Sequence, residues 1–119
     1  MKILLVEDDP ILRRTMQHLL PHWGYQVDVA DCGKAALDLL KDTEVDAVLL
    51  DQNLPDFLGC QIATILRHDL LNNCPIIIGL TGYIDPDEYQ TFIDSGMDEV
   101  LQKPLQKKQL EDALSALAK

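Results

Sequence analysis

Hydrophobic and polar residues follow two patterns along the chain, one typical of buried strands and one typical of amphipathic helices. The two patterns alternate five times. Short apolar segments typical of buried strands lie at 2–6, 25–30, 45–50, 75–80 and 99–102. Each is followed by a segment whose apolar residues are spaced as on one face of a helix, around 10–20, 35–40, 62–66, 86–95 and 105–117. The pattern therefore predicts five successive β-α units.

Capping and turn residues indicate where several of these helices begin and end. Asp9-Pro10 and Asp85-Pro86 each place a capping acid before a proline at the first helical position. Pro21 and Gly24 are expected to stop the first helix, and Gly96 is expected to stop the fourth. These signals support helices at 10–20 and 86–95.

Strict alternation of strands and helices predicts an α/β fold with a parallel sheet, covered on both faces by right-handed crossover connections. In such sheets the functional crevice lies beyond the carboxyl ends of the strands, where the chain order reverses. We therefore expect the chemistry in the residues that follow each strand. No linker, repeat or low-complexity tract interrupts the pattern, so residues 1–119 are expected to form a single domain.

Composition narrows the possible functions. The 119 residues include 20 acids against 10 lysines and arginines, for a formal net charge of −10. This charge argues against direct nucleic-acid binding, because phosphate backbones require a basic surface. The apolar runs are too short to span a membrane and no secretory signal is present, so we expect a cytoplasmic protein without membrane contact. Three cysteines without metal-ligand spacing are expected to be free, buried thiols.

Polar side chains follow four of the five predicted strands: Glu7, Asp8 and Asp9 after the first, Asp51 after the third, Thr81 after the fourth and Lys103 after the fifth. Two carboxylates about 4 Å apart repel by about 4 kcal/mol at an effective dielectric constant of about 20. A cluster of Glu7, Asp8 and Asp51 therefore requires a cation. Oxygen ligands without histidine or cysteine favour Mg²⁺, with Mn²⁺ as the alternative.

The remaining strand-end residues suit a phosphoryl group. Lys103 brings an ammonium and Thr81 a hydroxyl, both of which can bind phosphoryl oxygens. Asp51 is then left as the nucleophile, and attack of its carboxylate on phosphorus gives an acyl phosphate stabilised by the metal and Lys103. The strand ends therefore predict phosphoryl capture by Asp51.

Four segments together resemble the response-regulator receiver domain of two-component signalling, over essentially the full chain. They are 3–10, 48–55 followed by Gly59, 80–82, and Gly96 followed by Lys103-Pro104. Each motif is weakly specific alone, but their order and spacing are specific together. The resemblance implies a flavodoxin-like, doubly wound (βα)5 fold with strand order 2-1-3-4-5. The turn 96–98 resembles receivers attached to hybrid sensor histidine kinases.

The resemblance also implies a reaction and a metal site. Asp51 would accept a phosphoryl group from a histidine kinase or a histidine phosphotransfer protein, in a Mg²⁺-dependent reaction. Asp8, Asp51 and the backbone carbonyl of Asn53 would hold the metal, with Glu7 acting through water. In this family the positions of Asn53 and Tyr83 are tied to the lifetime of the phosphoryl group.

Thr81 and Lys103, by the same resemblance, would hold the phosphoryl oxygens. Movement of Thr81 would then change the surface around the fourth helix and the fifth strand, or the phosphoryl group would be relayed onward. The peptide bond between Lys103 and Pro104 is expected to be cis. Receivers usually place an aromatic residue three positions before the lysine, and this chain has Val100 there, which leaves the usual aromatic readout in question.

Three other functions remain open at this point. A degenerate receiver would act as a phosphorylation-independent docking module without binding magnesium. A phosphohydrolase with an aspartyl nucleophile usually has a second acid two residues further on, where this chain has Asn53. A flavodoxin-like cofactor binder needs a glycine-rich phosphate loop after the first strand, where this chain has acids. The only catalysis expected is slow Mg²⁺-dependent autophosphorylation and autodephosphorylation, so the chain is not expected to be an enzyme.

Overall fold

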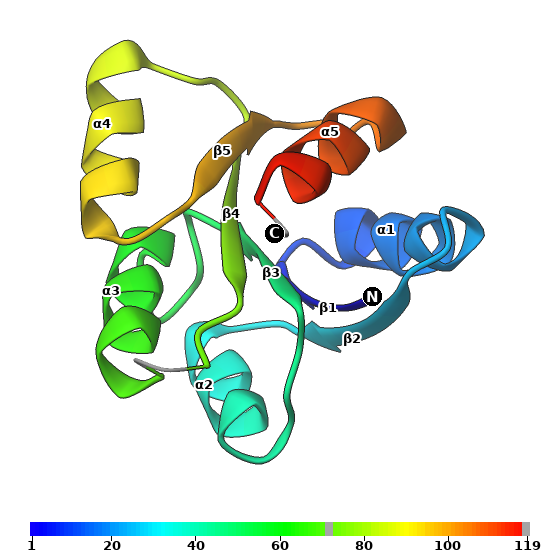
Figure 1. Ribbon diagram of the computed structural model, residues 1–119, viewed down its shortest axis with the longest axis horizontal. Coiled ribbons are helices and arrows are strands. Elements are labelled where there is room, and N and C mark those ends of the chain that lie inside the picture. Colours follow the sequence, from blue (N-terminus) through cyan, green and yellow to red (C-terminus); the bar gives the residue numbers. More distant parts are fainter. Residues whose placement is uncertain (71–72, 118–119) are drawn as a thin grey trace.

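The computed structural model describes residues 1–70 and 73–117, in which five strands alternate with five helices. In chain order they are β1 Lys2–Val6, α1 Pro10–His22, β2 Gln26–Ala30, α2 Gly33–Asp42, β3 Ala47–Asp51, α3 Gly59–Asp69, β4 Ile76–Thr81, α4 Pro86–Ser95, β5 Glu99–Gln102 and α5 Lys107–Leu117. All strands pair in parallel, in the order β2-β1-β3-β4-β5 (Figure 1). The predicted doubly wound fold is confirmed.

The helices cover the sheet on both faces. In Figure 1, α1 and α5 lie on one side and α2, α3 and α4 on the other. Successive strand residues point to opposite faces, so Ile3 and Leu5 belong to the core beneath α1 and α5, while Leu4 and Val6 belong to the core beneath the other three helices. Burial on both faces explains why the strands are continuous apolar runs in the sequence.

The strand order reverses between β1 and β3, and this reversal determines where a site can form. β3 is buried along its whole length, and its register pairs Val6 of β1 with Leu50. The next residue on each strand, Glu7 and Asp51, therefore emerges at the same edge of the sheet. β4 lies on the other side of β3 and pairs Leu80 with Asp51, which brings the residues that follow β4 to this edge as well.

One local expectation holds and another was wrong. The first helix ends at His22, between Pro21 and Gly24 as expected, with Trp23 as its cap and Gly24 at a φ of 98°. Pro21 lacks the N–H that would continue the helical bonding, and the helix ends one residue later. The three cysteines are free as predicted, but each is half-buried rather than buried.

Other expectations agree with the structure. Asp9 accepts hydrogen bonds from the Ile11 and Leu12 amides, so it caps α1, and Asp85 caps α4 through the Asp87 amide. Gly96 ends α4 with a φ of 121°. Among residues 1–70 and 73–117, no helix has the length and apolar character needed to cross a membrane.

Candidate functional site

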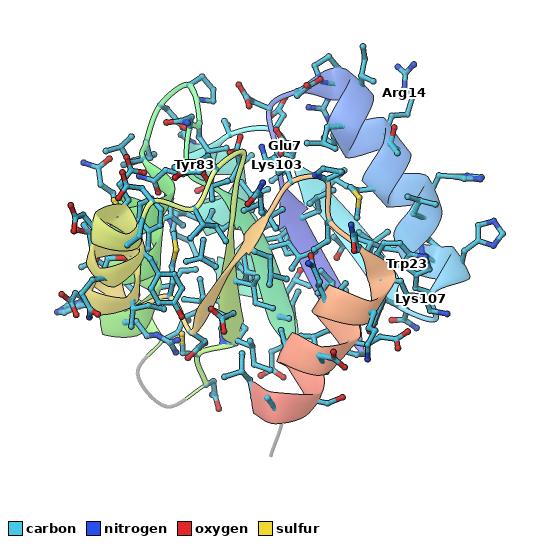
Figure 2. The ribbon with its side chains drawn as sticks, turned by 90° about the horizontal axis from the view of Figure 1, so that it is seen from above. Glu7, Arg14, Trp23, Tyr83, Lys103 and Lys107 are labelled. Carbon is cyan, nitrogen blue, oxygen red and sulfur yellow. The ribbon has the colours of Figure 1, made fainter. Side chains whose placement is uncertain are left out.

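Three strands deliver oppositely charged side chains to one point at the carboxyl edge of the sheet. The Lys103 ammonium follows β5 and lies 3.0 Å from Glu7 Oε2 and 3.1 Å from Asp51 Oδ1. It donates a hydrogen bond to Asp51. Figure 2 shows Glu7 and Lys103 together at this edge, and Tyr83 on the loop between β4 and α4. The peptide bond between Lys103 and Pro104 is cis, as predicted.

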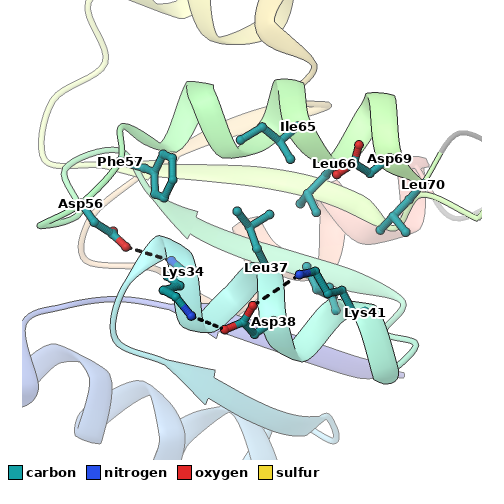
Figure 3. Close-up of a pocket in the computed structure, with 11 residues that line it drawn as sticks. Lys34, Leu37, Asp38, Lys41, Asp56, Phe57, Ile65, Leu66, Asp69 and Leu70 are labelled. Carbon is teal, nitrogen blue, oxygen red and sulfur yellow. Dashed lines mark hydrogen bonds and ion pairs between the residues drawn. The ribbon is translucent and has the colours of Figure 1, made fainter.

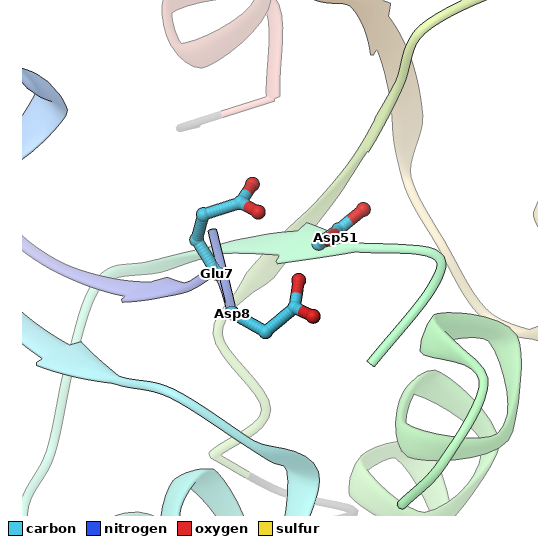
Figure 4. Close-up of side chains that lie close together, drawn as sticks. All are labelled: Glu7, Asp8 and Asp51. Atoms are coloured by element: carbon cyan, nitrogen blue, oxygen red, sulfur yellow. The ribbon is translucent and has the colours of Figure 1, made fainter. Parts of the chain in front are cut away.

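Asp8 completes a cluster of three acids. Glu7, Asp8 and Asp51 each offer a carboxylate oxygen, and these oxygens lie within 4.8 Å of one another (Figure 4). Glu7 and Asp51 are 1% and 5% exposed, whereas Asp8 is open to solvent. Glu7 and Asp51 therefore form the buried part of the cluster, and solvent reaches it on the side of Asp8. A site that binds an ion and a second reactant requires such access.

Burial and the neighbouring charges together raise the pKa values of both Glu7 and Lys103. Burial raises the pKa of the Glu7 carboxyl above its ordinary value of 4.5; the Lys103 ammonium opposes this rise and the Asp51 carboxylate adds to it. For Lys103, burial disfavours the charged form, but the carboxylates of Glu7 and Asp51 outweigh burial and raise its pKa. The ammonium thus stays charged and compensates only part of the negative charge.

The arrangement fits a hard divalent cation. All three acids supply oxygen, and no sulfur or imidazole group belongs to the cluster. Within the described part of the chain, Glu7 Oε2 is the one buried side-chain oxygen without a hydrogen bond, since its contact with Lys103 is an ion pair without hydrogen-bond alignment. Apart from the Lys103 ammonium at 3.0 Å, this oxygen has no donor, so a metal or a metal-bound water would satisfy its remaining acceptor capacity.

The raised pKa of Glu7 predicts how metal-free stability depends on pH. Between the ordinary pKa of about 4.5 and the higher folded-state pKa, the folded protein binds a proton that the unfolded chain does not. The free energy of unfolding should therefore rise as the pH falls from neutral through this window. In Glu7→Gln this contribution should be absent, and stability at neutral pH should be higher. Urea denaturation in a chelator from pH 7.5 to 5 checks this, and an equal pH slope in the two proteins contradicts it.

Asn53 is bonded to one of the acids, whereas the Thr81 hydroxyl is bonded to the loop that follows β4. The backbone N–H of Asn53 donates a hydrogen bond to Asp51 Oδ1 at 3.3 Å. The Thr81 hydroxyl donates instead to the Tyr83 carbonyl at 3.1 Å, while its backbone carbonyl accepts from the Lys103 amide at 2.7 Å. Thr81 is therefore attached to the Lys103 segment through the backbone, with its side chain engaged in the loop that leads to α4.

Two residues that support the site were missed in the sequence. Arg13, on the first turns of α1, donates to the backbone carbonyls of Glu7 and Asp8 at 3.1 and 3.4 Å. Asp56 accepts from backbone amides at the start of α2. The position of Arg13 just after the acids was an available signal, because the start of a helix following β1 must lie close to them. Nothing in the local sequence of Asp56 indicates a partner so far back in the chain.

A five-stranded parallel sheet in this order, with three acids and a lysine gathered at its carboxyl edge, defines a receiver-type signalling module. The chain belongs to the response-regulator receiver domain family, whose sequence model matches residues 3–115. Such domains act in two-component phosphorelay signalling and are signalling modules rather than classical enzymes.

Individual relatives agree with this family. The chain is 41% identical over 110 residues to the aerobic respiration control sensor protein ArcB of Escherichia coli K12, covering 88% of this chain and 14% of that protein. It is 35% identical over 118 residues to the sensor histidine kinase RcsC of the same organism, covering 99% of this chain and 12% of that protein. The chain thus spans about one seventh or less of the length of these sensor proteins.

A solved structure shows the same architecture. The chemotaxis response regulator CheY4 of Vibrio cholerae superposes with a TM-score of 0.87 at 27% identity, covering 98% of this chain and 97% of that chain. The likeness extends over nearly the full length of both chains.

Proposed function

We propose that this chain is a phospho-accepting receiver in which Asp51 takes a phosphoryl group from a phosphohistidine partner in a Mg²⁺-dependent reaction. The observation that carries the proposal is the meeting of Asp51 with Glu7, Asp8 and Lys103 at one edge of the sheet. An Asp51 carboxylate oxygen would form a bond to phosphorus as the phosphorus–nitrogen bond of the donor breaks. The electron pair of that bond returns to the imidazole, which takes up a proton.

The surrounding residues prepare Asp51 for this step. Asp8, Asp51 and the Asn53 backbone carbonyl would hold Mg²⁺, with Glu7 acting through water; Mn²⁺ suits the same oxygens. When bound, the ion neutralises negative charge on the transferring phosphoryl group. Lys103 already donates to Asp51 Oδ1, so its ammonium is within reach of a phosphoryl oxygen attached there.

Thr81 provides the proposed route from phosphorylation to a surface change. Its hydroxyl must leave the Tyr83 carbonyl, 3.1 Å away, in order to bind a phosphoryl oxygen on Asp51. The loop before α4 would then rearrange and alter the surface around α4 and β5, unless the phosphoryl group is relayed onward first. Val100 occupies the usual aromatic position and is buried at 3% exposure, so we assign the readout to this loop rather than to an aromatic rotation.

Exposed apolar side chains around the acids support a protein as the phosphoryl donor. Ile11 at the start of α1, Leu58 before α3 and Tyr83 before α4 are 78%, 45% and 70% exposed. All three follow strands at the carboxyl edge of the sheet, the edge that carries Asp51. A protein docked at this edge would cover these apolar side chains, which a small-molecule donor would leave exposed. A histidine kinase or a histidine phosphotransfer protein is the partner class we propose.

Incubation with Mg²⁺ and acetyl phosphate tests the proposal. The wild-type chain should gain the mass of one phosphoryl group, and peptide mapping should place it on Asp51. Asp51→Asn should gain none, because an amide is a poor nucleophile. Asp38→Asn removes an exposed acid of α2 that pairs with Lys34 and Lys41, and it should be labelled like wild type.

Two outcomes would favour another function. Absence of labelling, together with no Mg²⁺-induced change in the NMR signals around Asp51, would support the phosphorylation-independent docking module. Labelling that persists in Asp51→Asn would place the acceptor elsewhere. Rapid multiple turnover of acetyl phosphate would instead support a phosphohydrolase.

A further inference from the structure

The loop between β3 and α3, residues 52–58, is closed like a small hairpin. Asn53 and Leu58 form an antiparallel bridge, and the Leu54 amide donates to the Phe57 carbonyl at 3.2 Å. Pro55 and Asp56 therefore stand at the tip of the loop. Asn53 lies at its base, directly beside Asp51.

The tip of this loop is bound to the first turn of α2. Asp56 Oδ1 accepts from the Gly33 amide at 2.8 Å, and Asp56 Oδ2 accepts from the Lys34 amide at 2.9 Å. Figure 3 shows the contact with Lys34 at one end of the groove between α2 and α3. These bonds place a carboxylate on the positive end of the helix, where charge-assisted bonds to backbone amides are strong.

The helix has only a weak cap of its own. Cys32 occupies the N-cap position, and its Sγ accepts from the Ala35 amide at 3.4 Å, although sulfur is a poor acceptor. Asp56 thus supplies the strong cap of α2 from a segment more than twenty residues later. The Asp56 carboxylate therefore both caps α2 and attaches the 52–58 loop to it.

Packing reinforces the hydrogen bonds. A Cβ placed on Gly33 would lie 2.5 Å from Phe57 Cδ2 and 2.9 Å from Ile62 Cδ1, so the loop rests directly on the glycine backbone. The helix beneath it is anchored to the sheet by Ala36 and Leu40, both of which are buried. The first turn of α2 is therefore a firm support for the loop that carries Asn53.

We propose that Asp56 is a positioning residue for the acceptor site: by fixing the loop tip to α2, it sets the Asn53 backbone carbonyl in place and so raises the affinity for a divalent cation. The metal part of this inference rests on the proposed function, which takes that carbonyl as a ligand. A group that orients a ligand without touching the metal commonly changes metal affinity by a large factor.

Four variants separate positioning from simple helix capping. Asp56→Ala removes the link, and Asp38→Ala removes an acid from the same groove that bonds to lysine side chains and not to the loop. Cys32→Ser gives α2 a good local N-cap. The double variant Cys32→Ser/Asp56→Ala therefore restores the cap without restoring the link. Each is compared with wild type by thermal unfolding and by Mg²⁺ titration calorimetry.

The dissociation constant for Mg²⁺ should rise about tenfold in Asp56→Ala, as for other residues that orient a metal ligand. Asp38→Ala should stay within about twofold of wild type, because exposed charges at a distance are screened. In the double variant the melting temperature should recover while the dissociation constant remains raised. Recovery of both together, or equal constants in Asp56→Ala and Asp38→Ala, would overturn the proposal.

Amide hydrogen exchange keeps this inference separate from the proposed function. Exchange at the Leu54 amide, which is bonded to Phe57, should be faster in the double variant than in Cys32→Ser. Equal exchange would show that Asp56 does not hold the loop and would overturn the inference. If wild type binds no Mg²⁺, the proposed metal site fails, and faster exchange would still support Asp56 as the residue that positions the loop.

Discussion

Lys103→Met is expected to lower the free energy of unfolding by about 3 kcal/mol in the absence of divalent cations. Methionine keeps most of the length of the side chain but leaves Glu7 and Asp51, 1% and 5% exposed, facing one another without the ammonium. Removing one partner of a buried ion pair typically costs about 3–5 kcal/mol. The lower end of this range applies because the Lys103 side chain is 22% exposed. Urea denaturation in a chelator at pH 7.5 measures the loss.

Lys107→Met is the matched control for this prediction. Lys107 forms a 3.7 Å ion pair with Glu111 on the surface of α5, with side chains 55% and 45% exposed, and such pairs contribute about 0.5 kcal/mol or less. Saturating Mg²⁺ should stabilise Lys103→Met more than wild type, because the ion supplies the missing positive charge. If the two lysine variants lose equal stability, the ammonium does not compensate the buried acids.

Gly59→Ala is expected to destabilise the chain by about 2 kcal/mol, since overpacking of a tight contact costs about 1–3 kcal/mol. A Cβ at this position would lie 2.6 Å from the Asp51 backbone oxygen and 3.0 Å from Gln52 Cα. Both atoms belong to the backbone, so no side chain can turn aside. The Gly59 amide also donates to the Gln52 carbonyl at 2.8 Å. Relief of the clash must therefore shift the end of β3 and the start of α3 relative to one another, and acetyl phosphate labelling of Asp51 should slow as well.

Gly82→Ala provides the comparison for Gly59. Gly82 lies at the same edge of the sheet, but a Cβ there would have no neighbour within 4 Å. Its replacement should leave stability unchanged or raise it by up to about 1 kcal/mol, because alanine reduces the entropy of the unfolded chain. Urea denaturation of both variants checks the pair. A Gly59→Ala protein as stable as Gly82→Ala would mean that the backbone at the end of β3 moves freely.

The order of strands and helices was predictable because it depends on local periodicity. Continuous apolar runs such as 47–50 are buried on both faces of the sheet, and their alternation with helical segments favours a parallel sheet covered by helices. The end of the first helix was predictable from Pro21 and Gly24, and α1 ends at His22 between them.

The convergence of Glu7, Asp51 and Lys103 was also predictable, because the carboxyl ends of parallel strands meet at one edge. The direction of each side chain was not. The Thr81 hydroxyl could face the acids or the following loop, and the structure has it bonded to the Tyr83 carbonyl. The strand pattern predicts that Thr81 lies at the edge of the sheet, but the rotation about its Cα–Cβ bond determines which group its hydroxyl contacts.

The hydrophobic pattern and the residues after each strand were thus sufficient to predict a parallel sheet covered on both faces, with the acids and the lysine at its carboxyl edge, because both predictions depend on local sequence. The strand order came from the resemblance to receiver domains. Three-dimensional packing alone decided that Lys103 bridges Glu7 and Asp51 and that Asp56 caps a helix formed by a much earlier segment. Such contacts join residues far apart in the chain. Their geometry depends on how the helices and strands pack, so the sequence around each residue does not predict it.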